Sequence, residues 1–163
     1  MLIVPHCDTG TGMDPLSITT AIVTLLATTS TIISTCYDFK AALKNAPWSL
    51  TRIIEELRCL RNILESLEDI SHNADEALGS GKRPIFEMLS NQDSGPLIIC
   101  SRELRHLEEK IRSSSCVAIT GSKRKAALQA LVWQFKDSDA KKCLYRIDRC
   151  KSTLSLALTV DEA

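Results

Sequence analysis

Residues 50–67 read LTRIIEELRCLRNILESL, and this stretch decides the fold class. Its apolar residues recur at alternating steps of three and four, which places them on one face of an α-helix. The recurring positions are Leu50, Ile53, Leu57, Leu60, Leu64 and Leu67. Most of the charged residues between them are free to face solvent. The pattern therefore predicts a long amphipathic helix whose apolar face packs against other helices.

The stretch before it, residues 16–43, predicts another long helix. Asp14 is a good N-cap, and Pro15 stands where the first helical turn tolerates proline. The expected seam is Ile18, Ile22, Leu25, Thr29, Ile32, Cys36, Phe39 and Leu43. Pro47 ends this helix and begins the next one.

The rest of the chain repeats the helical period. A short helix is expected over residues 85–90, and Pro96 opens a long helix. Residues 113–122 form a polar linker, and Ser138 is expected to cap the last helix. Three long helices are predicted here: one that begins at Pro96, one that follows the linker and one that follows Ser138. Their apolar positions are, in this order, Leu97, Cys100, Leu104, Leu107 and Ile111; Leu128, Leu131, Val132 and Phe135; and Cys143, Ile147, Cys150, Leu154 and Ala157. Without any strictly alternating segment, we predict an all-α bundle of five main helices plus one short helix.

Bulk composition agrees with a folded intracellular domain. The chain is 44% hydrophobic, 25% charged and only 4% aromatic, a mixture that favours helices over sheets. Residues 1–100 carry 12 acidic and 7 basic side chains, a net −5, and residues 101–163 carry 8 acidic and 13 basic, a net +5. That excess is too small to predict nucleic-acid binding.

The seven cysteines match no zinc spacing, and their odd number argues against a disulfide framework. Cys36, Cys59, Cys100, Cys143 and Cys150 fall at or beside apolar helix positions, so we expect reduced thiols in the core. The first residues have no basic region and no cleavage site of a secretory signal. We therefore expect a cytoplasmic protein.

No motif predicts catalysis, a metal or a cofactor. Gly81 and Lys82 resemble the end of a phosphate-binding loop, but Glu76 stands where its first glycine is needed and Arg83 where its serine or threonine is needed. His106 lies near two adjacent glutamates, which is more simply a solvated helix face than a metal site. The sequence predicts a non-enzymatic protein.

Residues 15–37 contain no charge over 23 positions, ten of them Ser or Thr. This helix is long enough to cross a bilayer, but the simpler interpretation is a buried helix of the bundle. Threonine hydroxyls can bond to backbone carbonyls within the helix, so lipid is not excluded. The candidate residues for membrane or partner contact are Leu16, Ile18, Ile22, Leu25, Leu26, Ile32 and Ile33. Trp48 and Trp133 are either partner anchors or packing residues near helix junctions.

Several motifs carry a family resemblance. They are Met13-Asp-Pro-Leu-Ser-Ile18, Cys36-Tyr-Asp38, Ala46-Pro-Trp48, Leu131-Val-Trp133 and Cys150-Lys-Ser-Thr-Leu154. With them the chain resembles the HeLo-like N-terminal domains of fungal STAND or NLR-type proteins, including the type named after the azaphilone pigment biosynthesis cluster protein L. The resemblance implies residues 1–12 as an extension, 13–160 as the domain and 161–163 as a tail, with Met13 an alternative start to Met1. It also implies a signalling head that normally precedes a nucleotide-binding module. Because no such module follows here, we expect the product of a truncated gene, an adaptor that pairs with full-length relatives, or a pseudogene-like remnant.

Three functions stay open at this point. The first is a signalling domain that associates with protein partners, either copies of itself or related head domains. The second is a cell-death executioner whose helix 16–36 enters a membrane on activation. The third, suggested only by the family's name, is an accessory protein of a secondary-metabolite gene cluster.

Overall fold

The structure is a computed structural model and describes residues 15–76, 84–89, 95–115 and 137–162. These residues form the helices α1 (Pro15–Ala42), α2 (Trp48–Glu76), α3 (Pro84–Leu89), α4 (Pro96–Ser115) and α6 (Asp137–Glu162). They contain no strand, so the all-α prediction is confirmed. The described residues hold four long helices and one short one, so the predicted total of five long helices and one short one is confirmed only in part. The additional helix expected around Leu128 and Leu131 lies outside the described residues.

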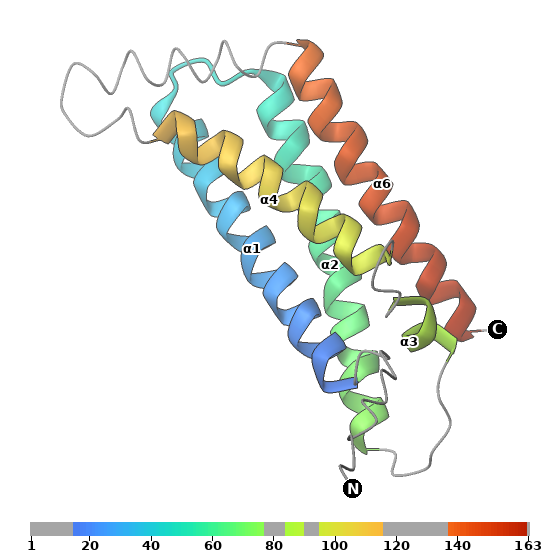
Figure 1. The fold of residues 1–163 in the computed structure, drawn as a ribbon. Helices are drawn as coiled ribbons and strands as arrows, with labels where there is room; N and C mark the ends of the chain where they lie inside the picture. The colour runs from blue at the N-terminus through green and yellow to red at the C-terminus, as the bar shows by residue number, and fades with distance from the viewer. Residues whose placement is uncertain (1–14, 77–83, 90–94, 116–136, 163) are drawn as a thin grey trace, which may run out of the picture.

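The four long helices form a bundle in which each helix packs against two neighbours. α1 packs against α2 and α4, and α6 packs against the same two helices. Figure 1 shows α1 and α4 running in one direction and α2 and α6 in the other. α3 lies at one end of the bundle and packs mainly against α6. The order around the bundle is therefore α1, α2, α6, α4.

The predicted seams supply the core. Every expected apolar position of α2, α4 and α6 is buried, and so are the α1 positions from Ile18 to Phe39. Thr29 is buried with them, because its hydroxyl donates to the Leu25 carbonyl at 2.7 Å. Leu43 lies just beyond α1 and is only half-buried. One contiguous cluster of side chains from all five helices thus holds the bundle together.

Prolines set two of the helix starts. The Gly95 carbonyl accepts from the Ile99 N–H at 3.1 Å, which makes Pro96 the first helical residue, where its missing N–H costs nothing. The Pro47 carbonyl accepts from the Leu50 N–H at 3.0 Å, and α2 begins at Trp48. The cap predicted at Ser138 is wrong, since α6 already begins at Asp137. Asp and Ser are both favoured at helix starts, so the sequence does not distinguish these neighbours.

Candidate interaction surfaces

Five threonine hydroxyls of α1 are satisfied within the helix. Besides Thr29, four threonines donate to the carbonyl four residues earlier, at 2.8–2.9 Å: Thr24, Thr28, Thr31 and Thr35. Such bonds remove the need for water or another side chain as partner. α1 can therefore lie in an apolar environment without leaving these hydroxyls unpaired.

The α1 residues predicted to contact a membrane or partner are largely occupied by the bundle itself. Ile18, Ile22, Leu25, Ile32 and Ile33 are buried, and Leu26 is half-buried against the core. The side chain of Leu16 is not among those described. Sequence reasoning missed the opposite face, which is exposed and uncharged from position 20 to position 37. Its members are Thr20, Val23, Thr24, Ala27, Ser30, Thr31, Ser34 and Tyr37.

By length and composition, one helix of the described chain could cross a membrane. It spans Ile18–Ala42 with a mean hydropathy of 1.5, and about a third of its most apolar window is buried in the bundle. A core helix of a soluble protein passes the same test, so this is weak evidence for membrane association.

Of the two candidate tryptophans, one lies in the described residues. Trp48 is 67% exposed at the start of α2 and lies outside the core. Trp133 lies outside the described residues.

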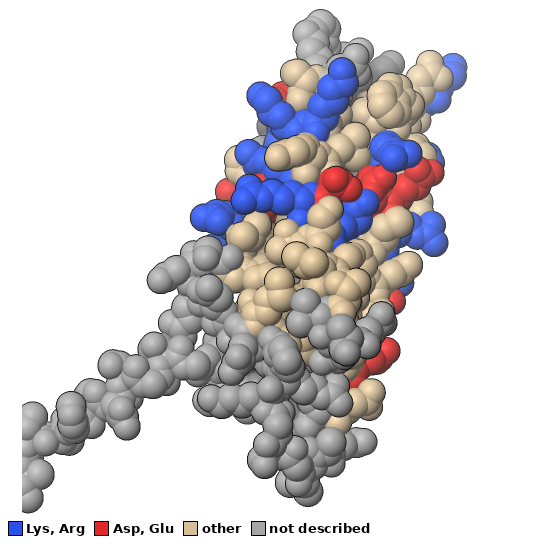
Figure 2. All heavy atoms as spheres, turned by 90° about the vertical axis from the view of Figure 1, so that its right-hand side faces the viewer, with Lys and Arg blue, Asp and Glu red and all other residues tan. Residues whose placement is uncertain are grey.

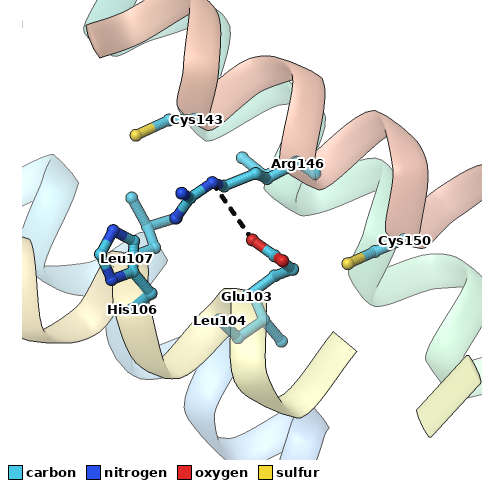
Figure 3. Close-up of a pocket in the computed structure, with 8 residues that line it drawn as sticks. Glu103, Leu104, His106, Leu107, Cys143, Arg146 and Cys150 are labelled. Atoms are coloured by element: carbon cyan, nitrogen blue, oxygen red, sulfur yellow. Dashed lines mark ion pairs between the residues drawn. The ribbon is translucent and has the colours of Figure 1, made fainter. Parts of the chain in front are cut away.

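Two ion pairs fasten α4 to α6, and a small cavity lies beside one of them (Figure 3). Glu103 pairs with Arg146 at 3.2 Å, and Lys110 pairs with Asp139 at 3.6 Å. The cavity has a volume of about 10 Å³ and is lined by Glu103, Leu104, His106, Leu107, Cys143, Arg146, Ile147 and Cys150. That volume holds at most about one water molecule. The space between α4 and α6 is therefore too small for a substrate or an organic cofactor.

Four of the five cysteines in the described residues are buried in the core, and Cys59 is the exception. Burial raises the pKa of the Cys36 thiol to about 12 and also raises that of Cys143. The pKa of Cys100 is raised first by the hydrogen bond between its thiol and that of Cys150, and then by burial. The prediction of a core thiol at Cys59 is wrong, because this residue lies beside the α2 seam and is exposed. Within the described residues no group of His, Cys, Asp or Glu is arranged to hold a metal ion.

A network of ion pairs lies between α2 and α6. Lys151 pairs with Glu56 across the two helices and with Asp148 at 3.3 Å, while Arg52 also pairs with Glu56 at 3.0 Å. The hydrogen bond to Glu56 raises the pKa of Lys151 above its ordinary value. Beside this network is an open hollow of about 240 Å³, lined by Arg52, Glu56, Leu144, Tyr145 and Asp148. Tyr145 stands at the edge of this hollow and is 71% exposed, and sequence reasoning missed it. Its position opposite the apolar seam of α6 would have indicated that it is exposed.

Comparison with known families adds the classification. The family model described as the N-terminal domain of pigment biosynthesis cluster protein PigL matches residues 13–161. The chain belongs to this family. The match covers all the helices described above except the last residue of α6, and it begins at Met13. The match confirms the resemblance to this domain type that the sequence motifs indicated. No curated protein and no solved structure matches the chain.

Proposed function

We propose that this PigL N-terminal family domain is a non-enzymatic protein–protein interaction domain of a cytoplasmic signalling pathway. Its partners are copies of itself or related head domains. The observation that carries this proposal is the contrast between inside and outside. The cavity between α4 and α6 has room for about one water molecule, whereas large side chains such as Trp48 and Tyr145 lie on the surface. Trp and Tyr are enriched among residues that dominate binding energy at interfaces.

Association is tested by sedimentation velocity between about 10 µM and about 1 mM, together with binding to purified head domains of the same family. We expect the mean sedimentation coefficient to rise with concentration, or a complex with a related head to form. A protein that stays monomeric over this range and binds no related head contradicts the proposal. Turnover of a small substrate would contradict it as well.

A second candidate function is membrane permeabilisation by α1. Its support is the uncharged outer face of this helix, on which the hydroxyls of Thr24 and Thr31 are already bonded to backbone carbonyls. Insertion requires α1 to leave the bundle, because its apolar seam is buried there. Charges at Leu25 and Leu26 would test insertion but would also disrupt the core, since Leu25 is buried.

Two exposed positions provide a cleaner test. If α1 permeabilises membranes, the double variant Val23→Asp, Ala27→Asp is expected to reduce dye release from anionic liposomes at least ~10-fold, because charges near the bilayer centre cost several kcal/mol. Both positions face solvent, so the fold should persist, which circular dichroism checks. The matched control is Ser152→Asp, an exposed change on α6. Equal dye release from wild type and the α1 variant excludes insertion of this helix.

A further inference from the structure

We propose that Cys100 of α4 and Cys150 of α6 form a reversible redox site, in which hydrogen peroxide joins the two thiols as a disulfide. The disulfide fastens α4 to α6 covalently, and a dithiol reductant releases the two helices again. Transient disulfides of this kind serve redox sensing in the cytosol. The inference goes beyond the proposed function, because it concerns the regulation of the bundle rather than its partners.

Cys100 and Cys150 already face each other across the interface between α4 and α6. These two helices pack together, both side chains are fully buried, and the two thiols share a hydrogen bond. An S–S bond of about 2.0 Å then requires only that the two sulfur atoms move closer. The pair can therefore be oxidised without a change in the arrangement of the helices.

Among the buried cysteines of the described residues, only Cys100 is placed to pair with Cys150. Cys143 and Cys150 are seven residues apart on α6, which separates their Cα atoms by about 10.5 Å. A disulfide joins Cα atoms about 4.4–6.8 Å apart, so these two residues cannot form one. The remaining buried cysteine, Cys36, lies on α1, which packs against α2 and α4, and it interacts with Cys143.

A small cavity gives an oxidant access to Cys150 (Figure 3). Cys150 lines the cavity of about 10 Å³ between α4 and α6, and so does the ion pair of Glu103 and Arg146. Both of these charged side chains are partly exposed, so they lie between the cavity and solvent. The cavity holds at most about one water molecule, and hydrogen peroxide is an oxidant close to water in size. A bulky disulfide reagent is excluded, so the site selects peroxide.

The surroundings of Cys150 favour its thiolate, the form that reacts with peroxide. The hydrogen bond from Cys100 lowers the pKa of Cys150 below its ordinary value against the effect of burial, and the charge of Arg149 acts in the same direction as the hydrogen bond. Figure 2 shows lysine and arginine gathered over one part of the face on which α6 lies, and all basic residues of α6 fall within residues 141–151. Cys150 is therefore the reacting thiolate, while Cys100 keeps its proton and donates the hydrogen bond.

The oxidation balances with hydrogen peroxide as the two-electron oxidant. The Cys150 thiolate attacks one peroxide oxygen, the O–O bond breaks, and Cys150 becomes a sulfenic acid. The hydroxide that leaves takes up the proton lost from Cys150 and becomes water. The sulfur of Cys100 then attacks the sulfenic sulfur, the S–O bond breaks, and the second hydroxide leaves as water with the proton of Cys100. Two thiols and one peroxide thus give one disulfide and two waters.

Peptide mapping of the full chain tests the pairing. The reduced protein is treated with hydrogen peroxide in native buffer, its remaining thiols are alkylated, and it is digested with trypsin. Trypsin cleaves after Arg102, Arg149 and Lys151. We therefore expect the peptide that ends at Arg102 joined to the dipeptide of residues 150–151, with two hydrogens fewer than the two thiol peptides together. Dithiothreitol should separate them again.

Variants assign the roles of the two thiols. In Cys100→Ser no thiol resolves the sulfenic acid on Cys150, so dimedone should label Cys150 at least ~10 times more than in wild type. Cys143→Ser removes the other thiol that lines the cavity and is the matched control, which should still form the disulfide. Oxidised wild type should melt at least ~5 °C above the reduced protein, because the disulfide closes a loop of about 50 residues. This shift should be absent in Cys100→Ser.

Three outcomes overturn the inference. The pair is not a redox site if Cys100 and Cys150 are still alkylated as free thiols after the exposed Cys59 has been oxidised. The assigned pairing is wrong if Cys150 is joined to a different cysteine, or to Cys100 only in urea. The disulfide does not fasten α4 to α6 if the oxidised and reduced proteins melt at the same temperature. None of these results bears on the proposed function, which depends on association with partners.

Discussion

Replacing Leu64 by alanine is expected to lower the free energy of unfolding by about 3–4 kcal/mol. Leu64 is fully buried on the seam of α2, the helix that packs against both α1 and α6. Truncation there removes apolar contacts and leaves a cavity that the surrounding helices fill only in part. The measurement is urea unfolding followed by circular dichroism, at a protein concentration well below any self-association.

Leu156→Ala is the matched control, because the same atoms are removed from a position that is 56% exposed. In the monomer this change should alter the unfolding free energy by less than about 0.5 kcal/mol. Equal effects at the two positions would show that the burial pattern of α2 and α6 described above is wrong.

Raising the pH from 9 to 11 is expected to destabilise the protein by about 2 kcal/mol through Cys36 alone. Burial raises the pKa of this thiol from its ordinary value of 9.0 to about 12. Between these two values the unfolded chain loses the thiol proton while the folded chain keeps it. The unfolded state then binds fewer protons, so stability falls as the pH rises, by about 1.4 kcal/mol per pH unit. Below pH 9 the contribution is fully present.

The alkaline effect is isolated by comparing slopes. Other groups with raised pKa values, including Cys143 and Lys151, act in the same direction in every variant. Cys36→Ala removes one titrating group, so its unfolding free energy should fall less steeply with pH, by about 1.4 kcal/mol per unit. Ser34→Ala, an exposed change on the same helix that removes no titrating group, should keep the wild-type slope. An unchanged slope in Cys36→Ala would mean that this thiol ionises as readily in the folded protein as in the unfolded chain.

Much of the fold is predictable from local periodicity. The spacing of Leu50, Leu57 and Leu64 identifies the buried face of α2, and the spacing of Ile22, Thr29 and Cys36 does the same for α1. This works because a helix returns to the same face every three or four residues, whatever lies beside it. Periodicity is less certain beside a seam than on it. Cys59, one position before Leu60, is for this reason predicted in the core although it is exposed.

The ion pairs between helices could not be predicted from local periodicity, because they depend on which helices are neighbours in the bundle. The Glu103–Arg146 and Glu56–Lys151 pairs join residues 43 and 95 positions apart, and no local pattern relates them. The amino-acid sequence by itself determined the helical class and the apolar face of each helix, because both follow from interactions within a few residues. Only the tertiary structure decided that α6 lies between α2 and α4 with Tyr145 and Leu156 facing outward. That arrangement follows from the packing of side chains far apart in the chain.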